Sequence, residues 1–277
     1  MDNYKLLMSI PISILLFSLV IISNNYLTIG SLMERDVELT GGLSITITTN
    51  ENIDINRIQK EFPDAYVRLA TGYGGGNSLI IQTKEMDEKN ILQKLEGLIE
   101  FDEKNVEIGK TEPVIGAIFW KQAQIAIILA FLFMAIVIFV LFHSPVPCSA
   151  VIFAAASDII STIAIMSLFG MKLSLPVFAA LLMLIGYSID TDILLTSRLL
   201  KRVGELKEKI ISAFKTGITM SITSMAALIS IYLFSEGTIL QQISIVLIIG
   251  LSIDVINTWI MNAGILRLWL ERKQRIR

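Results

Sequence analysis

Six apolar runs, each about 20 residues long, constrain this chain more than any other feature of its sequence. A lipid hydrocarbon core is roughly 30 Å thick, and about 20 helical residues cross it. Helices suit that environment because they satisfy their backbone hydrogen bonds internally. The sequence therefore predicts a polytopic α-helical membrane protein with six transmembrane helices, at residues 6–22, 123–142, 149–169, 175–195, 216–234 and 240–263.

The first run could also be a secretory signal peptide. Its apolar core is longer than that of a usual signal, and no cleavage site of small residues follows it. We therefore expect an uncleaved membrane anchor.

Composition excludes several classes of function. A net charge of −2 argues against an electrostatic nucleic-acid binder. The single cysteine, Cys148, cannot form an internal disulfide, and the single histidine, His143, cannot anchor a histidine-rich metal site. No phosphate-binding loop or pair of nucleophile and base is evident either. We therefore expect no enzyme, no cofactor and no metal.

Residues 24–122 differ from the apolar runs, because charges are frequent and the regular segments are short. Their order, β-α-β-β-α-β, predicts a ferredoxin-like α+β domain. The glycine-rich stretch 72–76 lacks the features of a phosphate cradle, so we expect a hairpin turn there. Period-2 and period-3.6 patterns place strands at 43–49, 65–70, 78–83 and 106–109, and helices at 51–62 and 87–99.

The distribution of Lys and Arg predicts the orientation, because short loops rich in positive charge stay in the cytoplasm. Six lie between Arg198 and Lys215 and five in the tail from Arg267, whereas the short loops on the opposite side contain only Lys172. We expect a multi-pass protein of the cell membrane with both termini cytoplasmic. Its parts are the N-terminus with the first helix (1–23), an extracytoplasmic domain (24–122), and a five-helix transmembrane domain with a cytoplasmic tail (123–277).

Four aspartates interrupt the apolar runs: Asp158, Asp190, Asp192 and Asp254. A charged Asp near the bilayer centre costs roughly 2.5–3.5 kcal/mol, and no Lys or Arg lies inside the runs. Asp190 and Asp192 lie about 200° apart around their helix, so they cannot serve one site. Because that helix is polar on two faces, it is expected in the middle of a bundle. The two stripes are Gly186-Asp190-Ser197 and Ser188-Asp192-Thr196.

Polar residues on neighbouring helices predict one buried polar core around the four aspartates. Carboxyl groups in a low-dielectric core can bind and release protons near neutral pH. One hypothesis is therefore a proton relay driven by the transmembrane potential. The alternative is that the aspartates, neutral or hydrogen-bonded, only fix helix packing. The supporting residues are Ser188, Thr219, Thr223 and Asn257.

Three motifs resemble those of a known family. Gly186-Tyr187-Ser188-Ile189-Asp190, with Arg198 after it, resembles the fourth-helix signature of SecF. Glu38-Leu39-Thr40-Gly41-Gly42 resembles the Asp-Phe-x-Gly-Gly motif that opens the outside domain, and Glu112–Gly116 in the sequence resembles the approach to the second helix. Together with six spans, these motifs make the chain similar to the SecD/SecF family, in its archaeal SecF branch. The fourth-helix pattern is also similar to that of resistance-nodulation-division (RND) transporters.

The chain departs from that family at its acids. Asp190-Thr191-Asp192 stands where bacterial SecF usually reads Asn-Asp-Thr. Asp190 matches the acid position of SecD and other RND members, whereas Asp192 is additional. Lys215-Thr216 stands where Arg-Thr is common, which weakens the carry-over of an arginine role at the fifth helix.

The resemblance implies an accessory subunit of the Sec protein-translocation apparatus in the lipid bilayer. It would act with SecD and the SecY/SecE translocon on a translocating polypeptide, coupled to the proton gradient, and would not bind nucleic acid. Two alternatives are a non-transporting scaffold that links SecD to the translocon and a half-size RND-type exporter.

Overall fold

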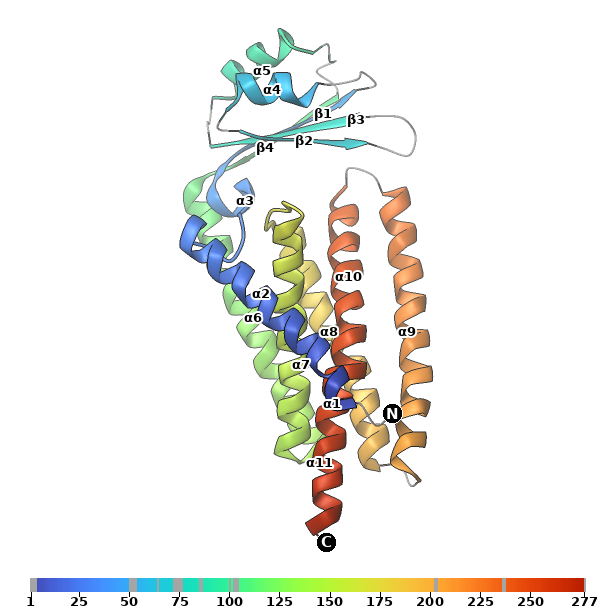
Figure 1. The fold of residues 1–277 in the computed structure, drawn as a ribbon. Coiled ribbons are helices and arrows are strands. Elements are labelled where there is room, and N and C mark those ends of the chain that lie inside the picture. Colours follow the sequence, from blue (N-terminus) through green and yellow to red (C-terminus); the bar gives the residue numbers. More distant parts are fainter. Residues whose placement is uncertain are drawn as a thin grey trace.

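The computed structural model describes residues 4–49, 54–63, 65–71, 77–84, 87–99, 101, 105–201, 204–235 and 238–276. A small α+β domain is stacked on one end of a bundle of long helices (Figure 1). Both ends of the described chain, α1 (Tyr4–Leu7) and α11 (Ala263–Ile276), lie in the half of the bundle away from the sheet.

The α+β domain contains one antiparallel sheet with strand order β2-β3-β1-β4. Two short helices cover its face away from the bundle (Figure 1). This is the arrangement of a ferredoxin-like domain, so the predicted α+β fold is confirmed. The hairpin turn predicted at 72–76 lies outside the described residues. The elements are β1 (Gly42–Thr49), α4 (Ile55–Glu61), β2 (Tyr66–Thr71), β3 (Asn77–Thr83), α5 (Glu88–Glu96) and β4 (Val106–Thr111).

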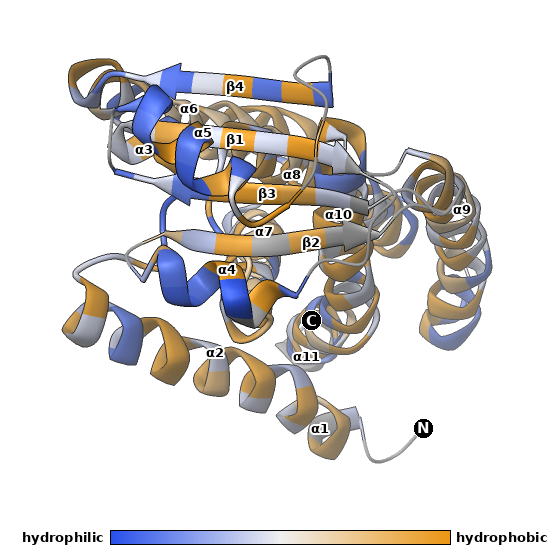
Figure 2. Cartoon of the chain, turned by 90° about the horizontal axis from the view of Figure 1, so that it is seen from above, coloured by the Kyte–Doolittle hydropathy of each residue, from blue (hydrophilic) through white to orange (hydrophobic). Residues whose placement is uncertain are grey.

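Alternation along the strands explains which face is covered. Leu43, Ile45 and Ile47 of β1 are fully buried and pack in one apolar cluster with residues of α4 and α5. The intervening Ser44 and Thr46 face the bundle side of the sheet, where they line a cavity of about 400 Å³. Figure 2 shows the same alternation of apolar and polar positions in a view from above.

Six helices of the described chain are long and apolar enough to cross a membrane, which confirms the predicted number. Several extend beyond the apolar run that predicted them, because hydropathy marks the part within lipid and not the end of the helix. They are α2 (Ser9–Ile29), α6 (Pro113–Phe142), α7 (Pro145–Leu168), α8 (Leu175–Lys201), α9 (Leu206–Phe234), and a last span made of α10 (Ile239–Ile256), the π-helical turn η2 (Asn257–Asn262) and α11.

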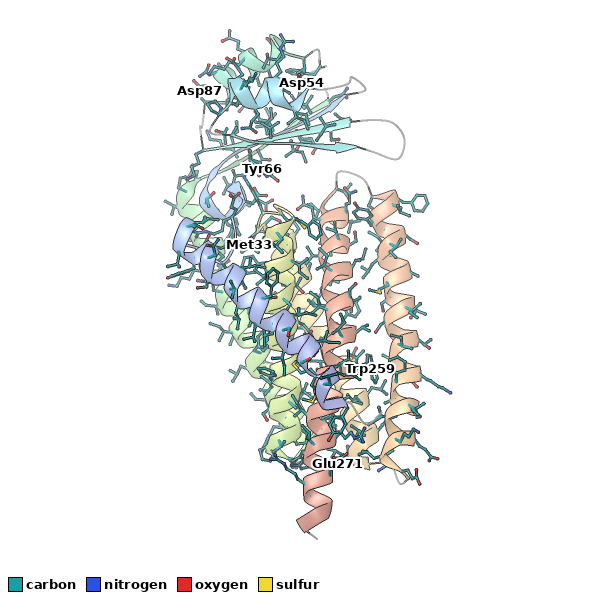
Figure 3. All side chains as sticks on the ribbon, viewed as in Figure 1. Met33, Asp54, Tyr66, Asp87, Trp259 and Glu271 are labelled. Atoms are coloured by element: carbon teal, nitrogen blue, oxygen red, sulfur yellow. The ribbon has the colours of Figure 1, made fainter. Side chains whose placement is uncertain are left out.

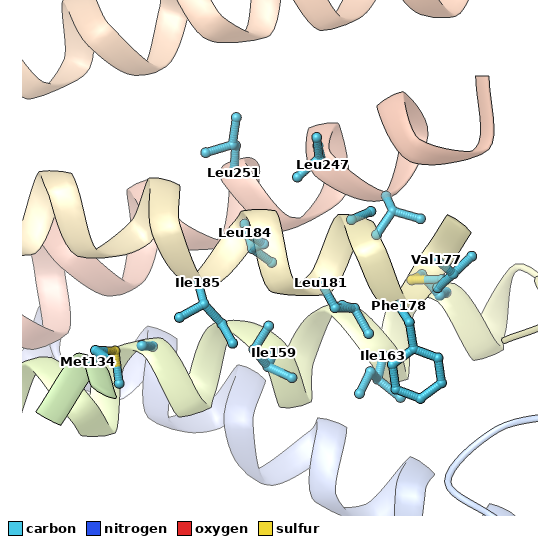
Figure 4. Close-up of a cluster of buried hydrophobic side chains, with 14 of the residues drawn as sticks. Met134, Ile159, Ile163, Val177, Phe178, Leu181, Leu184, Ile185, Leu247 and Leu251 are labelled. Carbon is cyan, nitrogen blue, oxygen red and sulfur yellow. The ribbon is translucent and has the colours of Figure 1, made fainter. Parts of the chain in front are cut away.

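α7 and α8 form the centre of the bundle. In their apolar segments 61% and 50% of the residues are buried, compared with 11% in α2 and α6 and 17% in α9. Leu181 and Leu184 of α8 lie between α7 and α10 (Figure 4), in a cluster that includes Ile159 and Leu247. α8 is therefore a central helix, as its sequence predicted, although only one of its two polar faces is buried.

Two glycine motifs meet where the α+β domain joins the bundle, next to the short helix α3 (Val37–Thr40). Gly41 has a φ of +81°, and a Cβ on it would lie 2.5 Å from Pro113 Cα. A Cβ on Gly116 would lie 2.8 Å from the backbone nitrogen of Gly41. Both motifs therefore need glycine, because their backbones are in direct contact.

The same segment also binds the start of α8. The Asp36 N–H donates to the carbonyl oxygen of Leu173 (2.8 Å), and the Leu173 N–H donates to that of Glu34 (2.7 Å). The N–H of Leu175, the first residue of α8, donates to Glu38 Oε2 (3.0 Å). A carboxylate at this position also suits the positive end of the helix dipole. The α+β domain is thus attached to α6 and to α8.

Tyr66 makes a further contact between the two parts. It extends from the sheet toward the bundle (Figure 3), and its hydroxyl donates to the carbonyl oxygen of Gly170 (3.1 Å). The ammonium group of Lys172 lies 3.8 Å from the centre of the Tyr66 ring, which is close enough for a cation–π interaction.

Replacing Gly116 by alanine tests the backbone contact. Alanine favours a helix over glycine by about 1 kcal/mol, but its Cβ would press on the backbone of Gly41 and Leu39. We expect Gly116→Ala to lower the free energy of unfolding by about 1–3 kcal/mol, measured by thermal unfolding in detergent. Gly186→Ala is the matched control, because a Cβ there meets nothing within 4 Å. A stabilised Gly116→Ala protein would contradict the contact.

Candidate functional site

Three of the four membrane aspartates meet in the middle of the bundle. Asp158 of α7, Asp192 of α8 and Asp254 of α10 each have an exposed fraction of 0%. The three helices pack against one another pairwise. We call Asp158, Asp192 and Asp254 the aspartate cluster.

Asp158 is held by donors from two other helices. Ser188 of α8 donates from its hydroxyl to Asp158 Oδ2 (2.6 Å). Asn257 of η2 donates from Nδ2 to Asp158 Oδ1 (2.7 Å). Two predicted supporting residues, Ser188 and Asn257, therefore lie in the polar core and join three helices through one carboxyl group.

Thr258 lies between the other two aspartates. Its Oγ1 is 3.0 Å from Asp192 Oδ1 and also 3.0 Å from Asp254 Oδ1. A hydroxyl has one proton, so it can donate to only one of these carboxylates at a time. The second contact becomes a hydrogen bond only when that carboxyl group carries a proton and donates to the threonine oxygen. The bridge is thus complete with one proton shared between Asp192 and Asp254.

The remaining donors in the cluster are also neutral. Asn262 donates from Nδ2 to Asp192 Oδ1 (2.6 Å). The Thr191 hydroxyl lies 3.2 Å from Asp254 Oδ2, but it also lies 2.9 Å from the carbonyl oxygen of Ser188, and its single proton serves one of them.

Several buried polar atoms of the core lack a hydrogen-bond partner among the described residues. Asp192 Oδ2 and the amide oxygens of Asn257 and Asn262 are buried and have no hydrogen-bond partner among the described residues. Unsatisfied buried acceptors are costly, and a proton on a carboxyl group supplies the kind of donor that is missing. The hydroxyl groups of Ser161 and Thr196 are likewise buried without a partner among the described residues, so the core has unpaired hydroxyls as well as unpaired acceptors.

The π-helical turn η2 presents three of these donors. Asn257, Thr258 and Asn262 all belong to it and all contact the aspartate cluster. A π turn accommodates one more residue than an α turn, and such turns are frequent at functional sites. Here the wide turn directs three polar side chains of one helix into the core.

Asp190 does not join the cluster, so the expectation that all four aspartates share one core is wrong for this residue. Its side chain is exposed, and it lines an open cavity with Ser197, Arg198 and Met220. The reason is helical geometry: Asp190 and Asp192 point in nearly opposite directions, and only the stripe of Ser188, Asp192 and Thr196 faces inward.

Thr219 and Thr223 also lie outside the polar core, contrary to the prediction. Both are exposed, and each donates its hydroxyl to a backbone carbonyl of its own helix, at Lys215 and Thr219 respectively. The helix instead turns Gly217 and Ser221 inward. A Cβ on Gly217 would lie 2.2 Å from the Trp259 ring, so close packing decides which face of α9 is buried.

Three other residues of the fourth-helix motif lie outside the aspartate cluster. Arg198 donates to the carbonyl oxygen of Ser212 (3.2 Å) and to Thr216 Oγ1 (3.0 Å), so it ties α8 to α9. Tyr187 is half-buried at the edge of the main apolar cluster, and Gly186 is exposed on the Asp190 side of α8.

Sequence reasoning missed Thr191 and Asn262. Thr191 lies between Asp190 and Asp192, and a single threonine between two acids carries no spacing signal of its own. Asn262 continues the spacing of Asp254 and Thr258, each four residues apart, which is the signal that could have placed it on the same face.

Comparisons with known proteins give one consistent family. Residues 91–272 match the family model described as "Protein export membrane protein SecD/SecF, C-terminal". A protein-export membrane protein SecF from Methanolacinia petrolearia is 38% identical over 97% of this chain and 94% of its own length. A protein of the same name from Pyrococcus furiosus is 39% identical over 99% of this chain and 93% of its own length.

Two solved structures share the fold. One is SecDF, a translocon-associated membrane protein, from Thermus thermophilus, with a TM-score of 0.77 and 18% identity over 98% of this chain. The other is SecDF in its super-membrane-facing form, with a TM-score of 0.57 and 16% identity over 99% of this chain. The present chain covers only 38% and 39% of those two chains.

Replacing Thr258 by valine tests the bridge between Asp192 and Asp254. The shape is kept, but both carboxyl groups lose their hydroxyl partner in a buried site. We expect the free energy of unfolding to fall by about 1–3 kcal/mol. Thr219→Val is the matched control on the exposed side of α9 and should change stability by less than about 0.5 kcal/mol. Equal effects of the two variants in thermal unfolding would argue against the bridge.

The buried Glu38 predicts that the stability of the protein depends on pH. Burial raises the pKa of Glu38 above its ordinary 4.5, the hydrogen bond from Leu175 opposes this, and the charge of Asp36 adds to it. The pKa of Glu38 is higher in the folded than in the unfolded protein. Its contribution to the free energy of unfolding is therefore fully present below pH 4.5 and is lost as the pH rises through the folded-state pKa. Glu38→Gln should flatten this decline in unfolding temperature between pH 4 and 7. An unchanged pH profile would assign the decline to other groups.

Proposed function

Because this chain belongs to the SecF family of protein-export membrane proteins, it serves protein export, and we propose that proton binding at its aspartate cluster assists that export. The observation that carries the proposal is the Thr258 bridge, in which one hydroxyl proton faces two buried carboxyl groups. With the shared proton Thr258 is hydrogen-bonded to both carboxyl groups, and without it to only one, so the link between α8 and the last span depends on that proton. The proposal involves no covalent change to the exported polypeptide.

A proton gradient can bias such a site because the two states bind the proton with different affinity. Moving one charge through the membrane potential releases about 2.3 kcal/mol per 100 mV. That energy is comparable to a charge-assisted hydrogen bond of roughly 1.5–3 kcal/mol. One proton therefore suffices to exchange one hydrogen-bonded arrangement for another.

α8 supports a route from the cluster to the α+β domain. Ser188, Thr191 and Asp192 lie on this helix, and its first residue, Leu175, donates to Glu38. Leu173, just before α8, pairs with the segment that leads into β1. A shift of α8 along its axis would therefore act directly on the base of the α+β domain.

We place the α+β domain outside the cell and both termini in the cytoplasm, on the basis of the Lys and Arg distribution. In this orientation the α+β domain meets a translocating polypeptide after it leaves the SecY/SecE channel. SecD is the proposed partner within the membrane, which agrees with the two solved chains of similar fold, both of which are SecDF.

A scaffold that links SecD to the translocon is the second candidate. The observation in its favour is that neutral donors from η2 and α8 already hold each aspartate, as in a packing interaction. A scaffold needs the cluster for assembly, whereas a proton-coupled subunit needs it for the response to a gradient.

Asparagine at position 192 separates the two candidates. We reconstitute the chain with its SecD and translocon in vesicles and measure export with and without an imposed proton gradient. Under the proposal, Asp192→Asn abolishes the acceleration by the gradient and leaves the gradient-free rate and the assembly unchanged. Asp87→Asn, on the surface of the α+β domain, is the control and should keep the acceleration. The scaffold candidate predicts a different result. Asp192→Asn would then reduce assembly of the complex, and the complex that still forms would keep its acceleration by the gradient.

A further inference from the structure

A cavity of about 120 Å³ lies in the half of the bundle away from the α+β domain. Three parts of the chain form its wall: the N-terminal segment, the start of α9, and the last span around Trp259, which Figure 3 labels. Much of the wall is apolar and comes from Leu7, Ile210 and Ile260. Leu7 has an exposed fraction of 48%, so the cavity lies at the outer surface of the bundle and not in its centre.

The cavity lies at the depth where hydrocarbon gives way to lipid headgroups. Trp259 is about 30 Å along the last span from its start at Ile239, which is the thickness of a hydrocarbon core. Arg267 is about 12 Å further along the same span. A helical side chain leans toward the N-terminus of its helix, so the guanidinium group of Arg267 reaches back toward the membrane.

The wall contains a hydrogen-bond donor that lacks an acceptor. The indole N–H of Trp259 is buried and has no partner among the described residues. The ring is held in place by α9, because a Cβ on Gly217 would lie 2.2 Å from it and the Phe214 ring packs edge-on against it at 5.2 Å between centres. A buried donor without an acceptor costs stability. The cavity therefore suits an occupant that brings an acceptor oxygen.

Water fits this cavity poorly. A buried water needs about two to four polar partners, and the wall offers few. At its rim the polar groups bind one another: the Tyr4 hydroxyl and Arg267 Nε donate to the two carboxylate oxygens of Glu271, at 2.9 and 2.7 Å. An apolar chain that carries an acceptor oxygen matches this wall better than a group of water molecules does.

We propose that the cavity binds an anionic phospholipid. Part of an acyl or isoprenoid chain contacts the apolar wall, a glycerol oxygen accepts from the Trp259 indole, and the phosphate lies at Arg267. Charge favours an anionic headgroup, because residues 263–277 contain five Lys and Arg and only one acid, Glu271. The bound lipid would join the N-terminal segment, α9 and the last span. The inference does not rest on proton binding at the aspartate cluster.

Quenching of tryptophan fluorescence tests the contact. The chain has three tryptophans, so Trp120→Phe with Trp269→Phe leaves Trp259 alone. This variant is reconstituted in phosphatidylcholine vesicles with increasing fractions of brominated phosphatidylglycerol or brominated phosphatidylcholine. We expect half-maximal quenching at an about tenfold lower fraction of the anionic lipid. Equal quenching by the two lipids would overturn the preference for an anionic headgroup. No quenching by either would mean that protein fills the cavity, which would overturn the inference.

Lipid binding to the chain with all its tryptophans gives a second measurement, which decides if the single-tryptophan variant does not fold. The purified chain is titrated in detergent with phosphatidylglycerol, and the bound lipid is counted by native mass spectrometry. Trp259→Phe keeps an aromatic ring but removes the N–H, and should weaken binding about fivefold. Arg267→Gln should weaken it by a similar factor of about five.

Two variants of α11 serve as matched controls. Trp269→Phe and Arg272→Gln change the same residue types at positions that do not line the cavity, and both should bind phosphatidylglycerol like the parent chain. Equal losses in the controls and in the cavity variants would reduce the interaction to general attraction by the basic tail and overturn the site. Inorganic phosphate that displaces the lipid would overturn the role of the apolar wall.

Discussion

A carboxyl group buried in a membrane without a cation is the constraint on which the rest of this structure depends. The aspartate cluster contains three such groups on three helices, and its recorded partners are hydroxyls and amides. Neutral donors stabilise a carboxylate less than an ion pair does, and each hydroxyl offers only one proton. Helix positions and proton content are therefore linked. In the proposed function, the number of protons in the core sets where α7, α8 and the last span lie relative to one another.

The glycine motifs connect the helix bundle to the α+β domain, so that a change in helix positions would reach that domain. Gly41 and Gly116 bring the α+β domain into backbone contact with α6, while Glu38 binds the start of α8. Since α6 lies at the edge of the bundle and α8 at its centre, the domain rests on one peripheral and one central helix. Relative movement of these two helices would tilt the domain, and a domain attached to a single helix would only follow it.

Much of the fold was predictable from sequence, because apolar runs and strand alternation are determined by local solvation. The six spans and the order of the ferredoxin-like strands follow from such patterns. The site was only partly predictable. Helical periodicity separated Asp190 from Asp192 but could not say which of them faced inward. For α9, the threonine stripe suggested the wrong face, since each hydroxyl bonds to its own backbone and the fit of Gly217 against Trp259 decides the packing. The π turn left no pattern in the sequence that we could read.

That π turn has a consequence at the far end of the last span. One additional residue in a turn rotates everything beyond it by about 100° around the helix axis. The face that α11 offers to the N-terminal segment is therefore determined at Asn257–Asn262. Gly264 accommodates Met8, and Tyr4 donates to Glu271 (2.9 Å), only in this rotational setting. The contact between the N-terminal segment and α11 and the hydrogen bonding of the buried acids thus both follow from a single irregularity in one helix.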